Sequence, residues 1–200
     1  NKIWLIVGGI FSALEPLAFL AMALFAVYMY RKGEKSHPNK IALFWTIGAS
    51  IVSFVGAGLL GFAHTLPQTN LYTHGTLVTA MHGHYAFWGA YAMIVLAIIS
   101  YALPNLTGRK RYNNTSGHMA FWFSNVGMLG MTVAFGVAGV AQVYLERKMK
   151  LDFMDVQNEI AIHFVVLLVC ATLFTTGITL FIIEFIKYGK PTDEALVKEE

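Results

Sequence analysis

The sequence predicts an all-α fold, a polytopic bundle of five membrane-spanning helices. Hydrophobic residues make up 56% of the 200-residue chain and charged residues only 12%, which is too apolar for an ordinary soluble domain. Long runs with few charges exceed the roughly 20 residues that cross a hydrocarbon core about 30 Å thick. Helices are expected because a segment in lipid must satisfy its own backbone hydrogen bonds. The predicted helices are residues 3–30, 41–63, 75–103, 119–145 and 160–186.

The first helix is predicted to carry an acid at membrane depth. Glu15 lies about twelve residues into it, or roughly 18 Å along its axis and near the bilayer middle, with Pro16 beside it. A carboxyl group at that depth favours its neutral form unless a cation or metal compensates, which suits proton transfer. The alternative is a structural acid, bonded to a neighbouring helix or to carbonyls loosened by Pro16. His82 lies at a similar predicted depth from the same side.

Polar residues gather where the second helix leads into the third. The connection from residue 64 to residue 74 contains no Lys or Arg. It carries His64, Thr65, Asn70 and His74. Two interpretations of these histidines stay open, since they could hold the carboxylates of a cofactor or simply lie in the membrane interface.

The third helix contains the sequence "TAMHGHYAFWGAY", in which His82 and His84 are separated by one glycine. Each helical residue turns about 100°, so these side chains point roughly 200° apart and cannot bind the same metal ion. A chelating pair on one helix needs spacing i, i+4 instead. The pair therefore suggests a helix between two cofactors, and haem iron accepts such axial histidines. The alternative is that both are hydrogen-bonded residues of the bundle core.

The last two helices carry weaker signals. Glycines in the fourth helix are spaced to let neighbouring backbones approach closely, and packing is their expected role; they are Gly127, Gly130, Gly136 and Gly139. Cys170 is the single cysteine and lies mid-helix, so the chain has neither an internal disulfide nor a C-x-x-C-H motif for a c-type haem. His163, near the start of the fifth helix, is expected to be a packed or interfacial residue.

Basic residues predict the orientation. They concentrate in the first connection, the third connection and the tail: Arg31, Lys32, Lys35, Lys40, Arg109, Lys110, Arg111, Lys187 and Lys190. By the positive-inside rule these segments are cytoplasmic, so the N-terminal end lies on the periplasmic side and the C-terminus in the cytoplasm. The fourth connection has basic residues among acids but faces outward by helix parity. His37 and His118 lie on the cytoplasmic side and need no special role. The net charge of +3 resides in these loops, and nothing indicates nucleic-acid binding.

Two stretches, "THGTLVTAMHGHYAFWGAY" and "ALEPLAFLAM", resemble the C-terminal part of the catalytic subunit of bacterial nitric oxide reductases, members of the haem-copper oxidase superfamily. The resemblance covers all 200 residues, as the last five of twelve transmembrane helices. It implies that His82 is the proximal ligand of high-spin haem b3 and that His84 is an axial ligand of low-spin haem b. It further implies that Glu15 is the buried glutamate near the binuclear centre. Thr65, Asn70 and His74 fall where the family places contacts near haem propionates and proton routes.

The resemblance favours NO over oxygen as substrate. Oxygen-reducing members resemble one another in a Thr- and Lys-bearing motif on the equivalent first helix, whereas this chain has Glu15 and no lysine in the core of that helix. The implied reaction is that two NO, two electrons and two protons give N2O and water in the bacterial inner membrane. The resemblance also implies that electrons and protons are supplied from the periplasmic side. The implied donor is a membrane-anchored cytochrome c subunit or, as in related enzymes, quinol.

One part of the family's site is missing from these residues. The resemblance implies a non-haem iron held by three histidines and a glutamate on earlier helices, which also carry the second ligand of haem b. We therefore expect residues 1–200 to be a single transmembrane domain that belongs to a longer chain, an expectation that the start at Asn1 rather than Met favours.

Three other functions remain open. One is an oxygen-reducing terminal oxidase subunit. Another is a pure electron-transfer cytochrome b, which would need paired histidines on both haems. The third is an ion or proton transporter without haem, in which Glu15 and the histidines form the relay.

Overall fold

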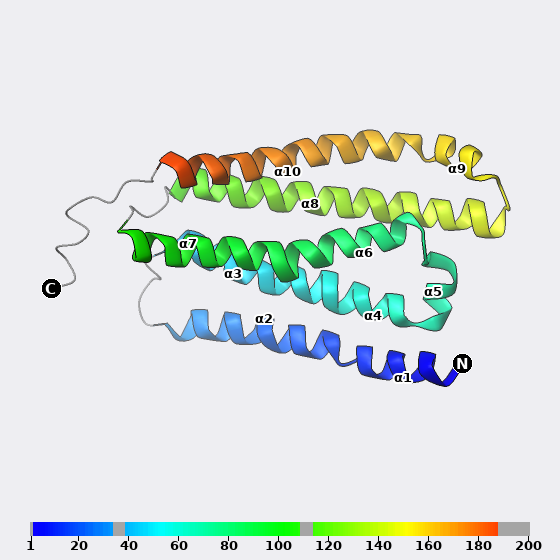
Figure 1. Cartoon of the computed structure of the whole chain (residues 1–200), viewed down its shortest axis with the longest axis horizontal. Coiled ribbons are helices and arrows are strands. Elements are labelled where there is room, and N and C mark those ends of the chain that lie inside the picture. Colours follow the sequence, from blue (N-terminus) through cyan, green and yellow to red (C-terminus); the bar gives the residue numbers. More distant parts are fainter. Residues whose placement is uncertain (1, 34–38, 109–113, 188–200) are drawn as a thin grey trace.

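A computed structural model of the chain describes residues 2–33, 39–108 and 114–187 (Figure 1). Within these ranges every regular element is a helix. Five segments are long and apolar enough to cross a membrane: Ile3–Lys32, Lys40–Thr65, Leu77–Thr107, Thr115–Lys148 and Ala161–Ile186. Each matches one predicted span to within a few residues. The predicted all-α polytopic bundle is thereby confirmed.

The spans divide into helices with π-helical insertions and short connecting helices. The first contains α1 (Lys2–Ser12) and α2 (Glu15–Lys32), and the second α3 (Lys40–Ser53), the π segment η1 (Phe54–Leu59) and α4 (Leu60–Thr65). After α5 (Pro67–Thr73), the third contains α6 (Leu77–Phe87), the π segment η2 (Trp88–Ala92) and α7 (Met93–Thr107). The fourth is α8 (Asn114–Val143) with the π segment η3 (Tyr144–Lys148), and α9 (Phe153–Glu159) leads into α10 (Ala161–Lys187).

The first span is interrupted where the sequence predicted one continuous helix. Ala13 and Leu14 form a turn between α1 and α2, and the Leu14 amide bonds to Phe11 O at 3.1 Å instead of to the carbonyl four residues back. Pro16 explains the break, because it lacks the N–H that would bond to the carbonyl of Ser12, four residues earlier, and its ring would clash with that carbonyl. Glu15 consequently lies at the first turn of α2.

A second proline is accommodated without a break. Pro104 lies inside α7 and cannot donate to the carbonyl of Ser100, four residues earlier. The side chain of Asn39 supplies the missing donor, with Nδ2 2.6 Å from Ser100 O. Because an unpaired carbonyl is costly in an apolar environment, this bond lets the helix run past the proline to Thr107.

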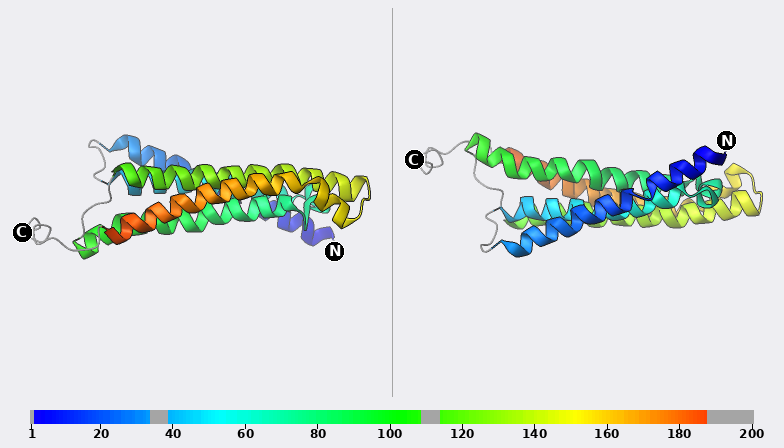
Figure 2. Two further views of the ribbon diagram at one scale, coloured as in Figure 1. Left: turned by 90° about the horizontal axis from the view of Figure 1, so that it is seen from above. Right: turned by 90° about the horizontal axis from the view of Figure 1, so that it is seen from below.

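Glycines set the spacing between the last two spans and their neighbours, as predicted. A Cβ on Gly127 would lie 2.5 Å from Phe174 N and 2.7 Å from Cys170 O of α10, while a Cβ on Gly130 would meet the Cys170 sulfur. Gly136 and Gly139 are in similarly close contact with α6. The fourth span therefore packs closely against both α10 and α6, and Figure 2 shows these helices running along the same axis.

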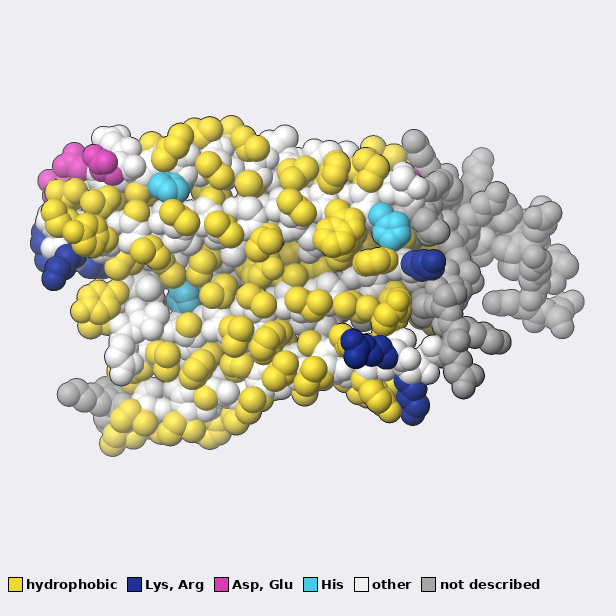
Figure 3. Space-filling view, turned by 180° about the vertical axis from the view of Figure 1, so that it is seen from behind, with side chains coloured by type: hydrophobic (Ala, Val, Ile, Leu, Met, Phe, Trp, Pro, Cys, Tyr) yellow, Lys and Arg dark blue, Asp and Glu magenta, His cyan; other side chains and the backbone are white. Residues whose placement is uncertain are grey.

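An aromatic cluster forms the core between α3, η2, α8 and α10. Trp45 is fully buried there, and its ring meets those of Trp88, Phe121 and Phe181 edge-on at centroid separations of 5.1 to 6.1 Å. The first span lies at the edge of the bundle and has no buried residue in α2. On the face shown in Figure 3, hydrophobic side chains cover the middle of the bundle and charged side chains lie toward its ends.

We predict that Gly127→Val destabilises the protein by about 1–3 kcal/mol, because the added methyl groups would collide with the α10 backbone. The measurement is thermal or denaturant unfolding of the detergent-solubilised protein. Gly9→Val is the matched control, since no side chain or neighbouring helix of the described chain lies within 4 Å of a Cβ at that position. Equal unfolding midpoints for the two variants would contradict the prediction.

Candidate functional site

The imidazole of His82 is held by a backbone carbonyl of the second span. His82 Nδ1 lies 3.0 Å from Gly56 O. In an α-helix that carbonyl would accept from the Leu60 amide, but within η1 the Leu60 amide bonds to Val55 O instead. The π-helical geometry thus frees Gly56 O for the histidine. Since a carbonyl oxygen only accepts, Nδ1 carries the proton, and Nε2 of the neutral ring keeps its lone pair for another partner.

Glycines bring the second and third spans close enough for this bond. A Cβ on Gly56 would lie 2.8 Å from the backbone of Tyr85 and Ala86, and one on Gly89 would lie 2.6 Å from Ser53 N. Both glycines lie in π segments. Direct backbone packing therefore fixes the position of α6 relative to η1.

The start of α6 is tied to the fourth span. The Leu77 amide donates to Gln142 Oε1 at 2.9 Å, and Gln142 Nε2 donates to Glu146 Oε1 at 2.9 Å. The Thr76 hydroxyl accepts from the Val78 amide and caps the helix. These contacts satisfy amides at the helix start and hold the helix that carries both histidines.

His84 faces the fourth span. Its Nδ1 lies 2.8 Å from Ala80 O, and its ring stacks on Phe135 of α8 at 5.0 Å. Beside it is an apolar groove of about 560 Å³ between the third span, α8 and α10. The groove is lined by Ala80, Gly83, His84, Phe87, Trp88, Ala92, Met128 and Phe174. A Cβ on Gly83 would meet nothing within 4 Å in the described chain, so this wall of the groove is open.

The two histidines therefore lie on opposite sides of one helix, as their spacing predicted. His82 contacts η1, whereas His84 contacts α8. In both rings Nδ1 donates to a carbonyl and Nε2 is available as a ligand. Each ring accordingly resembles a metal-ligating histidine whose tautomer is set by its second nitrogen.

Glu15 and His82 come together around Gly61 of α4. A Cβ on Gly61 would lie 3.7 Å from Glu15 Oε2, 3.3 Å from His82 Cε1 and 4.0 Å from His82 Nε2. The carboxylate of Glu15 in the first span and the imidazole of His82 in the third span therefore lie at the same depth along the bundle axis. Glycine at this point leaves the space between them free of any side chain from α4.

His64, for which two interpretations were open, lies directly against His82. The two imidazoles stack with centroids 5.1 Å apart and an interplanar angle of 25°. His64 Nδ1 lies 2.9 Å from Leu60 O, while its Nε2 is buried and has no hydrogen-bond partner in the described part of the chain. The residue pattern did not predict this contact. His64 lies two helical turns beyond Gly56, the residue of the second span that bonds to His82, so the contact depends on how the second and third spans pack.

The other predicted residues lie at the end of α4, in α5 and at its C-terminal cap. Thr65 Oγ1 donates to Phe62 O at 2.8 Å, and Asn70 Nδ2 donates to His64 O at 2.8 Å. His74 is exposed and ends α5, with its amide bonded to Asn70 O. Thr65 and Asn70 thus order the chain next to His64, and the bonds described here join them to the backbone of α4 rather than to the rings of the third span.

Of the remaining described histidines, one makes a local contact and one packs against another span. His163 Nδ1 lies 3.1 Å from Ile160 O, and His118 packs edge-on against Phe44; His37 lies outside the described residues. Glu184 of α10 is only 6% exposed, and the sequence pattern did not single it out. Within the described ranges no group of three or more His, Cys, Asp or Glu residues could hold a metal ion.

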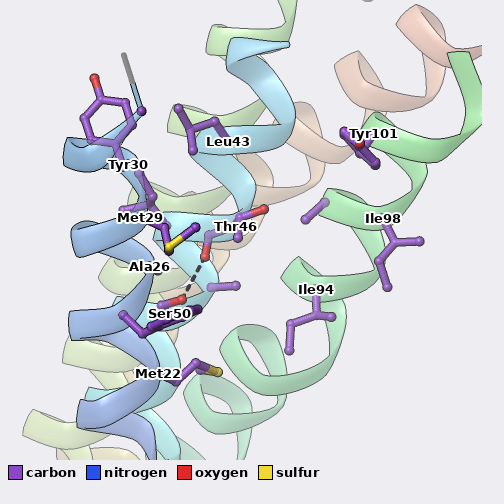
Figure 4. A pocket seen from close by; sticks show the side chains of 15 residues that line it. Met22, Ala26, Met29, Tyr30, Leu43, Thr46, Ser50, Ile94, Ile98 and Tyr101 are labelled. Carbon is purple, nitrogen blue, oxygen red and sulfur yellow. Dashed lines mark hydrogen bonds between the residues drawn. The ribbon is translucent and has the colours of Figure 1, made fainter. Parts of the chain in front are cut away.

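A larger cavity lies away from the histidines. It has a volume of about 820 Å³ and separates α2 from α3 and α7. Apolar side chains such as Met22 and Ile94 line it, together with Thr46 and Ser50. Figure 4 shows the hydrogen bond that the Ser50 hydroxyl donates to the backbone carbonyl of Thr46. No histidine or acid of the described chain lines this cavity, so the candidate chemistry belongs to the region around His82 and His84.

Haem iron accepts axial histidines, and ionisable residues within membrane spans mark functional sites. Residues 1–173 match the family model for cytochrome c and quinol oxidase polypeptide I. The chain belongs to this family, the haem-copper oxidase family that the motifs resembled. It is also 41% identical over 196 residues to a nitric oxide reductase subunit of Stutzerimonas stutzeri, an alignment that covers 94% of this chain and 41% of that protein. The chain thus spans about two fifths of that relative's length.

The donor set fits the haems that this family implies. Each histidine presents a free Nε2, and the groove beside His84 is apolar and of a size that holds a cofactor. Beside His82, the absent side chain of Gly61 leaves space, and the unpaired Nε2 of His64 is a buried polar atom that needs a partner.

We predict that Gly56→Ala loosens α6, because the added Cβ would meet the Tyr85 and Ala86 backbone at 2.8 Å and push the π segment away. Hydrogen–deuterium exchange read by mass spectrometry should show faster exchange of amides in residues 77–87. Gly8→Ala is the control, since a Cβ there meets nothing within 4 Å in the described chain. Unchanged exchange of the α6 peptides in Gly56→Ala would refute the prediction.

Proposed function

We propose that the chain is part of the catalytic subunit of a membrane nitric oxide reductase, which reduces two NO to N2O and water with two electrons and two protons. The observation that carries the proposal is the pair of oppositely directed imidazoles, His82 and His84, each with Nδ1 tethered and Nε2 free. The similarity to the nitric oxide reductase of Stutzerimonas stutzeri supports the choice of substrate.

The two histidines have different tasks in this proposal. His82 would hold high-spin haem b3 and His84 low-spin haem b, and these haems supply the redox chemistry when bound. The carbonyl bonds of both rings fix their tautomers and orientation, so that each Nε2 would be free to bind a haem iron. The single helix α6 would then carry one ligand for each haem.

Glu15 serves as the proton-handling group. Its carboxylate lies at the level of His82 Nε2 and is exposed in this part of the protein. A carboxyl there can hold a proton and release it to the substrate oxygen that leaves as water, or it can steady the non-haem iron. Thr65, Asn70 and His74 lie around the outer end of the same site and would contact haem propionates or a proton route.

The site needs components that the described residues do not supply. The ligands of the non-haem iron and the second ligand of haem b would come from the remainder of the catalytic subunit. A membrane-anchored cytochrome c subunit or quinol would donate electrons. We infer an orientation in the bacterial inner membrane with the N-terminal end periplasmic and the C-terminus cytoplasmic, supported by Arg31, Lys32 and Lys40 at one end of the bundle.

Oxygen reduction is the second candidate, because the matching family model describes cytochrome c and quinol oxidases. The two functions make different demands on the first span. Glu15 places an acid near His82, and α2 carries no lysine before Lys32 at its end. That arrangement favours NO, and assays with both gases decide between the two.

We predict that His82→Ala and His84→Ala remove different haems from the purified full-length enzyme. His82→Ala should abolish carbon monoxide binding while the low-spin spectrum persists. His84→Ala should remove the low-spin spectrum while carbon monoxide binding persists. Optical spectra of the reduced protein with and without carbon monoxide provide the measurement. His163→Ala is the control, because that ring bonds only locally to Ile160 O. If the wild type lacks a Soret band, or if both substitutions affect one haem, the haem assignment fails.

We predict that Glu15→Gln lowers NO reduction by about 100-fold or more, the scale of a lost general acid, and leaves both haem spectra intact. Glu15→Asp should retain more activity, since it keeps an ionisable group. The measurement is N2O production with parallel oxygen uptake. Wild-type turnover in Glu15→Gln would eliminate the proton role, and oxygen uptake without N2O production in the wild type would establish the oxidase alternative.

A further inference from the structure

His64 is a histidine for which the proposed function has no task, yet its ring lies directly against that of His82. The two rings lie nearly parallel at 5.1 Å. They come from different spans, since His64 belongs to α4 and His82 to α6. The contact is therefore a feature of tertiary packing and does not follow from helix periodicity.

The His64 ring is itself immobilised. Nδ1 bonds to Leu60 O one turn earlier at 2.9 Å, and the carbonyl of His64 accepts from Asn70 Nδ2 at 2.8 Å. The side chain and the backbone of this residue are thus both held, so the ring presents a fixed flat surface. Its Nε2 is buried without a partner in the described residues, which indicates that a further group completes the site beside it.

His82 needs a second restraint in addition to its hydrogen bond. The bond from Nδ1 to Gly56 O anchors one edge of the imidazole but leaves the ring free to rock about that anchor. A flat surface against the ring face blocks this motion. A ligating nitrogen binds its metal most strongly when the lone pair, which lies in the ring plane, points at the metal, and partners of the ligand set that direction.

We propose that His64 is a positioning residue that fixes the plane of the His82 imidazole by ring stacking. This inference rests on the proposed function, in that His82 holds a haem. The stacked ring face is what matters, so phenylalanine can replace His64 and an aliphatic side chain cannot.

The test compares His64→Phe with His64→Leu in the full-length enzyme, using His163→Leu as the control. The measurement is the iron–histidine stretching band in the resonance Raman spectrum of the reduced high-spin haem. His64→Leu should shift and broaden this band and release the haem to a scavenger protein about 10-fold faster, the scale of a lost ligand partner. His64→Phe and the control should match the wild type.

The possible outcomes distinguish the stacking role from the proposed function. A wild-type band in His64→Leu, or an equal shift in His64→Phe and His64→Leu, overturns the stacking role while leaving haem binding by His82 intact. If His64→Leu fails to assemble, the iron–histidine band of His64→Phe alone decides whether stacking is the role of His64. A shifted band in His64→Phe would show that the ring nitrogens of His64 matter, and would overturn the stacking role. Absence of any iron–histidine band in the wild type refutes haem ligation by His82 itself.

Discussion

The hydrogen bond from His82 Nδ1 to Gly56 O is the contact on which the rest of the site depends. It exists because η1 is π-helical and redirects the Leu60 amide to Val55 O, which leaves one carbonyl of a buried helix available. In lipid such a carbonyl must find another donor, and the imidazole is that donor. The same bond sets the tautomer of His82. The π-helical geometry of η1 therefore also determines which nitrogen of His82 is available as a ligand.

Close backbone contact makes this bond possible, and glycine makes the contact possible. Gly56 meets α6, Gly89 meets α3, and Gly139 meets the start of α6 from the fourth span. The third span is therefore held on two sides by backbone atoms. Apolar side chains alone provide little driving force for association between helices in lipid, so such contacts, together with Gln142 at the first turn of α6, give the histidine helix its fixed position.

Much of this arrangement could be predicted from residue patterns, and the remainder depends on tertiary contacts. Run length identified the five spans, helix periodicity placed His82 and His84 on opposite faces, and spacing marked Gly127 and Gly139 as packing residues. The π segments were not predictable, because no residue pattern marks where the backbone shifts to i→i+5 hydrogen bonds. The stacking of His64 on His82 and the role of Asn39 beside Pro104 join positions far apart in sequence, and no local pattern encodes such pairs.

His82, His84 and Glu15 have different surroundings, which matches the different roles that these residues have in the proposed enzyme. His82 is surrounded by Gly56, Gly61 and His64 from the second span, whereas His84 opens into an apolar groove and Glu15 is exposed at the edge of the bundle. An acid inside a membrane span is costly unless a partner or water faces it, so the exposed side of Glu15 is where a metal and its ligands would be stabilising. The chain spans 41% of its relative's length. In the proposed assembly the further helices therefore meet this chain at Glu15 and His84, because the second span already encloses the other side of His82.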